Sequence, residues 1–293
     1  MVSLAVDSSP QPGSRPNSSS SDAHVAQKLA HDPDRPKDLP MNSVQRFSDR
    51  VDDYVRYRPS YPAALIDRLA VLGKLGSDRV IADVGSGTGI LTRLLLASGA
   101  RVIGVEPNAP MRAAAEKALS DEPRFESKDA RAEATGLGDG SVDLITAAQA
   151  FHWFEPAATR AEFARILKPT GQVALIWNQR SDTPVNLDYE AMLERFAPDY
   201  QNVREKDRAA ESRVSAFFAP ASVQFESFAS EQRFDEAGLR GRLTSSSYAP
   251  RPSSPLYEPM MAELTSIFGK HVAKGEVVLP YETILWYGSL DSR

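Results

Sequence analysis

The feature that most constrains the fold is a short run in which an apolar segment gives way to closely spaced glycines. It reads Val-Ile-Ala-Asp-Val-Gly-Ser-Gly-Thr-Gly-Ile over residues 80–90. The apolar, β-branched part predicts a buried strand, and the amphipathic pattern that follows predicts a helix. Glycines at alternate positions between the two leave bare backbone against which a ligand can lie. We therefore predict a ligand site at the carboxyl end of this strand.

The spacing of the glycines and a later acid indicate the kind of ligand. Dinucleotide sites use G-x-G-x-x-G, which counted from Gly85 requires glycine where this chain has Ile90; here the third glycine is Gly89. The next predicted strand is followed by Glu106, about 20 residues on, where a carboxylate binds the two hydroxyls of a ribose. The pattern favours a site for a nucleoside that carries no phosphate group.

Hydrophobic periodicity predicts an alternation of strands and helices through the first part of the chain. Strands are predicted at 79–84, 101–105, 124–128, 142–148 and 172–178, with helices at 61–74, 88–98, 109–119 and 156–167. This alternation predicts parallel strands joined by right-handed crossovers, with any ligand along their carboxyl edge.

The regular alternation of strands and helices ends after Asn178. Helices are predicted near 186–196, 234–243 and 255–272, and strands near 222–230 and 276–288. We expect these two strands to complete the sheet and the helices to cover its active edge as a lid.

The predicted domain organisation follows these patterns. Residues 1–40 form a Ser/Pro-rich tail that we predict to be disordered, because it is too poor in apolar residues to build a core. Residues 41–293 form one domain, made of a ligand-binding core at 42–180, a substrate-selecting lid at 181–275 and a last strand at 276–288.

Composition narrows the classes of partner. The 293 residues are 42% hydrophobic and 25% charged, and no apolar stretch approaches the ~20 residues that span a bilayer, so we expect a soluble protein without a membrane partner. The absence of cysteine and the dispersed histidines predict no metal site and fit a reducing, cytoplasmic location. A net charge of -5 argues against nucleic acid and favours a small-molecule substrate. We expect a monomer or a homodimer.

At Asp83, the glycines and Glu106 the sequence resembles the class I S-adenosylmethionine-dependent methyltransferases. Within them it is most similar to the type 11 domain and to the small-molecule group related to trans-aconitate methyltransferase, and the resemblance is good over 42–180. It implies a Rossmann-like α/β fold with a seven-stranded, mostly parallel sheet and helical lid insertions, and S-adenosyl-L-methionine as the cofactor.

The resemblance also assigns cofactor contacts. In that family the acid at the end of the first strand and the glycine turn hold the methionine moiety. The acid after the second strand binds both ribose hydroxyls, and two residues that follow it contact the adenine ring. The matching residues here are Asp83, Gly85, Ser86, Gly87 and Gly89, then Glu106, then Pro107 and Met111. Ala132 and Glu133 lie in the segment that matches the family's contacts to the edge of the adenine ring. Arg131 stands where members of the family often carry Asp.

Two further segments resemble the family's active edge. Residues 46–62 are similar to an entry segment that folds over the cofactor, in which Tyr57 and Arg58 would approach the methionine carboxylate; a solvated charged helix end is the alternative. Arg180, just after the fifth predicted strand, could clamp an acidic substrate.

The strand at 142–148 delivers Gln149 and an aromatic cluster to the edge where the methyl group would lie. We assign Gln149 to the cofactor, and Phe151 and Trp153 to the substrate. His152 has two interpretations: a base that accepts a proton from a hydroxyl or amine, or a packed histidine bonded to backbone.

The sequence therefore predicts methyl transfer from S-adenosylmethionine to a small molecule, at an oxygen of a carboxylate or hydroxyl. The methyl carbon is already activated by the positive sulfur, so its transfer to the acceptor needs alignment and exclusion of water rather than a protein nucleophile. Two alternatives stay open: a non-catalytic nucleoside-binding regulatory module, and a methyltransferase for protein or nucleic acid.

Overall fold

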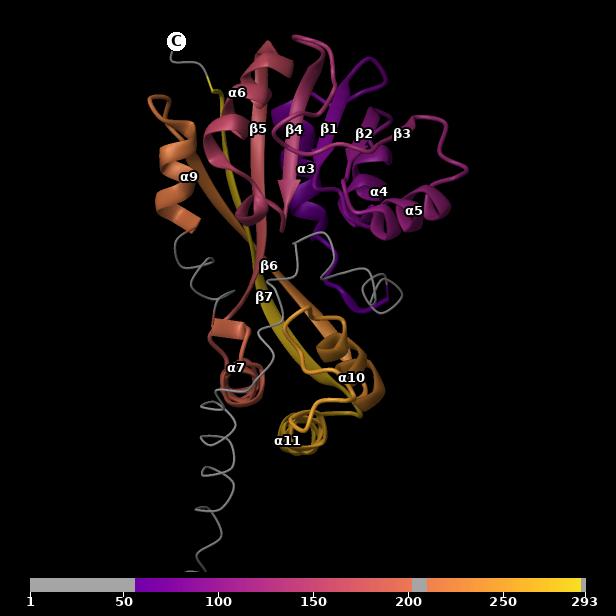
Figure 1. The fold of residues 1–293 in the computed structure, drawn as a ribbon, viewed down its shortest axis with the longest axis vertical. Coiled ribbons are helices and arrows are strands. Elements are labelled where there is room, and N and C mark those ends of the chain that lie inside the picture. Colours follow the sequence, from indigo (N-terminus) through magenta and orange to yellow (C-terminus); the bar gives the residue numbers. More distant parts are fainter. Residues whose placement is uncertain (1–55, 202–209, 291–293) are drawn as a thin grey trace, which may run out of the picture. The chain divides into compact units, whose positions relative to one another are not determined.

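The computed structural model describes residues 56–201 and 210–290, which all belong to one compact unit, Asn42–Arg293. The predicted tail at 1–40 lies outside the described residues. The unit is built on a seven-stranded sheet with the order β3-β2-β1-β4-β5-β7-β6 (Figure 1). Its strands are β1 Val80–Val84, β2 Arg101–Val105, β3 Phe125–Lys128, β4 Val142–Ala148, β5 Leu167–Arg180, β6 Gln224–Phe234 and β7 Val277–Gly288.

The direction of the strands confirms the predicted fold class. Strands β1 to β5 pair in parallel, and β7 lies antiparallel between β5 and β6. The two late strands therefore complete the sheet, as the sequence predicts. Because the parallel strands all end at one edge, the glycine turn after β1 and Glu106 after β2 lie at that edge.

Helices cover both faces of the sheet, because successive residues of each strand point to opposite sides. The covering helices are α3 Ala63–Gly73, α4 Ile90–Leu96, α5 Ala109–Ala118, α6 Pro156–Ile166 and α9 Ala210–Phe218. Ile81 packs with α3 and α4 on one face, whereas Ala82 packs with α6 and α9 on the other. Over residues 56–201 and 210–290, no helix has the length and apolar character needed to cross a bilayer.

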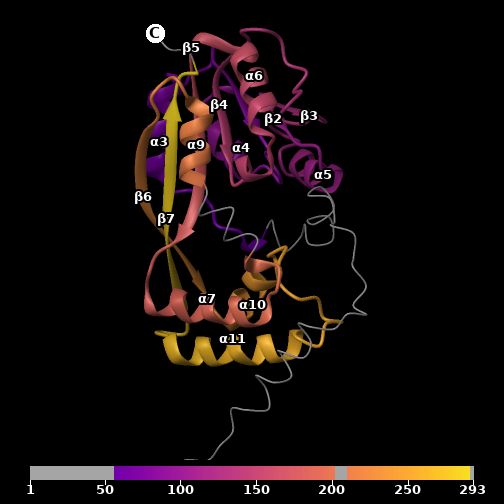
Figure 2. The ribbon, with the colours of Figure 1, turned by 60° about the vertical axis from the view of Figure 1, so that its left-hand side comes forward.

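Three further helices form a lobe beyond the carboxyl edge of the sheet. They are α7 Pro184–Phe196, α10 Glu236–Thr244 and α11 Tyr257–His271. Figures 1 and 2 show that β5, β6 and β7 run on past the end of β4 and reach this lobe. The lobe has its own apolar core, in which Tyr189 and Leu193 of α7 meet Met260 and Leu264 of α11. The long strands thus hold the helices opposite the glycine turn.

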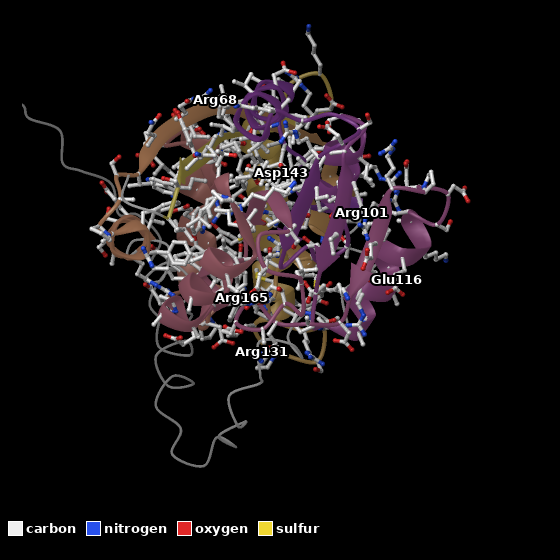
Figure 3. The ribbon with its side chains drawn as sticks, turned by 90° about the horizontal axis from the view of Figure 1, so that it is seen from above. Arg68, Arg101, Glu116, Arg131, Asp143 and Arg165 are labelled. Carbon is white, nitrogen blue, oxygen red and sulfur yellow. The ribbon has the colours of Figure 1, made fainter. Side chains whose placement is uncertain are left out.

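The opposite edge of the sheet, where the parallel strands begin, carries a charged cluster. Asp143, at the start of β4, is 6% exposed and accepts hydrogen bonds from Arg79 at 2.9 Å, Lys168 at 2.7 Å and the Val80 N–H at 3.0 Å. Figure 3 looks onto this edge and labels Asp143 within it. Desolvation raises the pKa of Asp143, but these donors outweigh it and hold the pKa below its usual range. The cluster anchors the beginnings of β1, β4 and β5.

Two differences from the predicted elements are larger than a shift of a few residues at an element's end. Strand β5 begins at Leu167 rather than 172, because the pairing of β4 with β5 shifts register between Val142 and Leu144 and absorbs the Pro169–Gly171 segment. Helix α9 lies in a stretch for which the sequence analysis predicted no element. Its Val214, Phe217 and Phe218 are buried, at the spacing of one helix face.

Glu162 on α6 supplies a prediction about acid stability. It accepts hydrogen bonds from Arg165 at 2.8 Å and from the Thr135 N–H at 2.8 Å, and the Arg165 contact is the largest cause that lowers the pKa of Glu162 to about 2. A lowered pKa contributes stability that is present above the unfolded value and is lost as pH falls toward the folded one. We therefore expect Glu162→Gln to cost stability at neutral pH, and the cost to shrink as pH falls from about 4.5 toward about 2.

Urea denaturation of both proteins at a series of pH values measures this difference. Glu258→Gln, at an exposed position in the first turn of α11, is the control and should change little at any pH. A Glu162→Gln cost that stayed constant from pH 7 to the acid limit of reversible unfolding would contradict the assignment.

Candidate functional site

The glycine run forms a sharp turn between β1 and α4. Gly85, Gly87 and Gly89 have φ values of +72°, +58° and +81°, in the left-handed region that residues with a Cβ rarely adopt. The N–H groups of Gly85 and Ser86 donate to the carbonyl of Val105 at 2.8 and 3.3 Å. These bonds fix the turn beside the end of β2, and its three positive φ values explain why the chain has glycine at alternate positions.

Asp83 lies one residue before the end of β1 and is 1% exposed. Its carboxylate accepts hydrogen bonds from the hydroxyls of Thr92 on α4 at 2.6 Å and of Thr146 on β4 at 2.8 Å. Burial raises the pKa of Asp83, and these two hydroxyls oppose the rise. The contacts hold the side chain under the glycine turn, where it lines the cavity described below.

Glu106 follows β2 directly and is 7% exposed. Its two carboxylate oxygens accept one hydrogen bond each, from the Gly87 N–H at 2.9 Å and the Asn108 N–H at 2.8 Å. Burial raises the pKa of Glu106, and the two N–H groups and Arg112 act against it. A carboxylate has about four acceptor positions, so Glu106 keeps capacity for two more donors.

A cavity of about 130 Å³ lies between these acids and the glycine turn. Its lining is Tyr61, Asp83, Gly85, Ser86, Gly87, Thr88, Ile90, Leu91, Glu106, Pro107, Asn108, Met111, Ala148, Gln149, Ala150, Trp153 and Phe154. Among the described residues that line this cavity, Asp83 and Glu106 are acids and none is lysine or arginine. The cavity therefore suits a ligand with hydroxyl donors or positive charge and lacks side-chain cations for a phosphate.

Comparisons with known proteins identify the family. The model of the methyltransferase domain matches residues 82–175, which include the glycine turn and Glu106. An uncharacterized methyltransferase of Mycobacterium tuberculosis is 39% identical over 136 residues, and the match covers 46% of this chain and 53% of the relative. The chain thus spans about half the length of these first relatives. An uncharacterized methyltransferase of Schizosaccharomyces pombe is 30% identical over 223 residues, which cover 75% of this chain and 86% of the relative.

The chain belongs to the class I S-adenosylmethionine-dependent methyltransferases. The fold agrees: a solved structure from Anaeromyxobacter dehalogenans, provisionally described as a type II methyltransferase, superposes with a TM-score of 0.57. That likeness covers 81% of this chain and 100% of the other, at 24% sequence identity. S-adenosylmethionine is the cofactor of the family.

The residues of the first cavity fit that cofactor, which is a nucleoside with a positive sulfur and no phosphate. A Cβ built on Gly87 meets no atom within 4 Å, so the glycine leaves space in the cavity wall for a ligand. The spare acceptor positions of Glu106 suit two ribose hydroxyls. Asp83 and Glu106 supply negative charge without a competing side-chain cation in the lining.

Most predicted cofactor contacts of this methyltransferase lie together in the first cavity, and several lie elsewhere. Those that line it are Asp83, Gly85, Ser86, Gly87, Glu106, Pro107, Met111 and Gln149. Gly89 is the N-cap of α4, where its hydrogen faces α5 and a Cβ would lie 3.3 Å from that of Ala115. Ala132 is buried in the main core, and Glu133 accepts a hydrogen bond from the Glu155 N–H at 2.9 Å. Neither of the two lines the cavity.

A second, larger cavity of about 860 Å³ lies between the carboxyl edge and the lobe of α7, α10 and α11. Tyr61, Ile90, Gln149 and Trp153 line both cavities, so the two adjoin. Arg58, His152 and Arg180, three of the predicted site residues, line only the second. Tyr57 lines neither: it packs against the core of the lobe, beside Gly241.

Gln149 marks the junction of the two cavities. Its φ of +54° is unusual for a residue with a side chain, and strained backbone of this kind is enriched at functional sites. The Gln149 N–H donates to the Ile176 carbonyl at 2.9 Å, and the side-chain amide donates to the Asn178 carbonyl at 3.2 Å. Both bonds tie the end of β4 to β5 and hold the strained conformation.

Phe151 requires a correction, because it lines neither cavity. It begins the 3₁₀ turn Phe151–Trp153, is 1% exposed, and packs edge-on against Trp177 and Phe217. A 3₁₀ helix has three residues per turn, so three neighbours cannot face the same side. Phe151 therefore points into the core, while His152 and Trp153 border the second cavity.

Sequence reasoning missed other lining residues of the first cavity. Tyr61 belongs to the entry segment 46–62 of the sequence analysis. Asn108 carries the signal of an N-cap, since its side chain accepts from the Met111 N–H at 3.1 Å. Phe154 and Thr88 gave no separate signal, because each stands beside a stronger candidate in the sequence.

Proposed function

We propose that the protein transfers the methyl group of S-adenosylmethionine to an oxygen of a small-molecule acceptor, either a carboxylate or a hydroxyl. The observation that carries the proposal is the pair of adjoining cavities. The first is acidic, lies on the glycine turn and has no basic lining, and the second is about 860 Å³, within the roughly 300–1,000 Å³ of small-molecule sites.

In this proposal the first cavity holds the cofactor. Glu106 accepts the two ribose hydroxyls, Pro107 and Met111 contact the adenine, and Asp83 with the glycine turn holds the methionine end. The bound cofactor supplies a methyl group activated by positive sulfur. Trp153, which borders both cavities, favours that charge by cation–π attraction of roughly 0.5–2 kcal/mol.

The acceptor occupies the second cavity, and the protein's main contribution is alignment. Proximity and orientation supply roughly 7–11 kcal/mol in well-oriented reactions. Residues of the lobe, among them Glu190 of α7 and Arg242 of α10, line the cavity, and an acceptor bound there displaces water from the reacting atoms. A carboxylate acceptor needs no base, whereas a hydroxyl acceptor passes its proton to His152, which lines this cavity.

His152→Ala tests the role of this histidine. If the acceptor is a hydroxyl, we expect kcat to fall about 10²–10⁴-fold, the usual worth of a general base, while the Kd of the cofactor changes little. The rising limb of the pH–rate profile should also disappear. His271→Ala, which removes a histidine paired with Asp188 on α7, is the control. With a hydroxyl acceptor, equal turnover by the His152→Ala variant and the wild type at all pH values would assign His152 to packing.

The activity itself is tested by two measurements on the full chain. Calorimetry with S-adenosylmethionine measures cofactor binding, and release of S-adenosylhomocysteine measures turnover against a panel of small acids and alcohols. Turnover with any member supports the proposal. Tight cofactor binding with no acceptor would favour a regulatory module, and RNA or DNA binding that weakens steeply with salt would favour a nucleic-acid substrate.

A further inference from the structure

The part of the second cavity formed by the lobe is lined with arginine and tyrosine. Arg180 stands at the end of β5, Arg242 on α10, and Tyr281 on β7. Tyr200 and Tyr248 complete this arginine–tyrosine cluster, and their rings lie 5.0 Å apart. The residues come from segments far apart in the sequence, so only the folded lobe assembles them.

Arg180 is held in place and its charge is balanced. Its side chain is 11% exposed, donates to the Tyr200 hydroxyl at 2.7 Å and pairs with Glu190 at 3.3 Å. Its guanidinium also lies 5.4 Å from the ring of Tyr189. These contacts fix the orientation of the guanidinium in the cavity wall.

Arg242 differs, because its charge lacks a counterion among the residues that the structure describes. It is 3% exposed and donates from Nη1 to the Ser246 hydroxyl at 3.1 Å. Within the described ranges its Nε is buried without a hydrogen-bond partner, and so is the hydroxyl of Tyr281, which is 3% exposed. Burying a charge without a partner is costly, so a lining arginine in this state points to an anionic ligand.

The register of the sheet separates this cluster from the place of methyl transfer. Ile176 of β5 pairs with Ala148, next to Gln149 where the cavities adjoin. Arg180 lies four residues farther along the strand, so its Cα is about 13 Å beyond that level. Tyr281 pairs with Arg180 at the same height. This offset favours an anion site in the cluster that is separate from the oxygen that receives the methyl group.

We propose that Arg180, Arg242 and Tyr281 form an anchoring subsite for a carboxylate of the acceptor, at the end of the cavity away from the reacting oxygen. This inference rests on the proposed function, and it narrows the acceptor to a molecule that carries a carboxylate besides its methylated oxygen. Since Glu190 already balances Arg180, a single negative charge suffices for Arg242. A carboxylate has one such charge, whereas a phosphate monoester brings nearly two at neutral pH.

Tyr248 gives the subsite a measurable pH dependence. Burial raises the pKa of Tyr248, but Arg180, Arg242 and Arg58 outweigh it and bring the pKa to about 8. The groups that face it are those three arginines with Tyr189, Tyr200 and Ser246. Above that pH the phenolate competes with a bound carboxylate for the arginines. We therefore expect anion binding to weaken above about pH 8 and to raise the pKa of Tyr248.

The experiment uses the full chain saturated with S-adenosylhomocysteine, and three probes: glutarate, monomethyl glutarate and inorganic phosphate. Calorimetry and the rise in Tm measure binding without turnover. We expect glutarate and monomethyl glutarate to bind the wild type, and Arg242→Gln to weaken both at least tenfold. Arg240→Gln, on the same helix but paired with Glu236, is the matched control and should bind as the wild type does.

A second variant keeps the test valid if Arg242→Gln does not fold. Tyr281→Phe removes one hydroxyl and should weaken glutarate several-fold without changing the affinity for S-adenosylhomocysteine. The proposal would be overturned if neither glutarate nor monomethyl glutarate bound the wild type, or if Arg242→Gln bound them as tightly as the wild type. Tighter binding of phosphate than of glutarate would also overturn it.

The two proposals fail separately. Glutarate binding that depends on Arg242, without methyl transfer to any acceptor, would retain the subsite and refute the activity. Turnover of a neutral acceptor, with kcat/KM unchanged in Arg242→Gln, would retain the activity and refute the subsite.

Discussion

Glu106→Gln is expected to weaken S-adenosylmethionine binding about ten- to hundredfold, which is about 1.4–2.8 kcal/mol. The carboxylate accepts from the N–H groups of Gly87 and Asn108 and has acceptor positions left for two ribose hydroxyls. A glutamine keeps the size but offers one oxygen, and its NH₂ group would face one of the two N–H donors. The loss therefore combines the charge-assisted bonds to ribose with a mispaired turn.

Calorimetry with S-adenosylmethionine and with S-adenosylhomocysteine measures this loss for both charge states of the sulfur. Glu126→Gln is the matched control, because Glu126 stands on the neighbouring strand β3, pairs with Arg101 and lies outside both cavities. If Glu106→Gln bound either ligand as tightly as Glu126→Gln did, Glu106 would not be the ribose ligand.

The core of the fold was predictable because its signals are local. The apolar run 142–148 reflects burial on both faces of a strand, the helix pattern of 156–167 reflects burial on one side of a helix, and the structure has β4 and α6 there. The glycine turn was predictable for a related reason. The turn has three positive φ values, which glycine adopts more readily than any residue with a Cβ. The glycines in the sequence therefore indicate this backbone conformation.

The lining of the second cavity was less predictable, because it depends on tertiary contacts. Arg242 stands in a helix of mixed polarity and reads as a solvated charge; only the packing of α10 in the lobe buries it. Phe151 shows the reverse, since an aromatic beside His152 and Trp153 reads as part of the site until the 3₁₀ turn directs it inward. Arg180 was predictable, because it follows a strand whose carboxyl end had to lie at the active edge.

Gly87→Ala is expected to abolish detectable cofactor binding, at least a hundredfold loss, while the protein stays folded. A Cβ on Gly87 would meet no protein atom within 4 Å, but it would project into the wall of the first cavity. The cost to the fold is the left-handed φ of +58°, roughly 1–2 kcal/mol for alanine. Gly85 is a poorer test, because its Cβ would lie 2.5 Å from the Cβ of Ala150 and disturb the turn itself.

Gly140→Ala separates the strain from the loss of space. Gly140 has a φ of +54°, its Cβ would also meet nothing within 4 Å, and it lies in the loop before β4, outside both cavities. Thermal unfolding should therefore show a similar fall in Tm for the two variants, and calorimetry with S-adenosylmethionine should show lost binding for Gly87→Ala alone. Comparable affinities in the two variants would mean that the cofactor does not lie against the turn, because a methyl group in its path excludes close approach of any ligand.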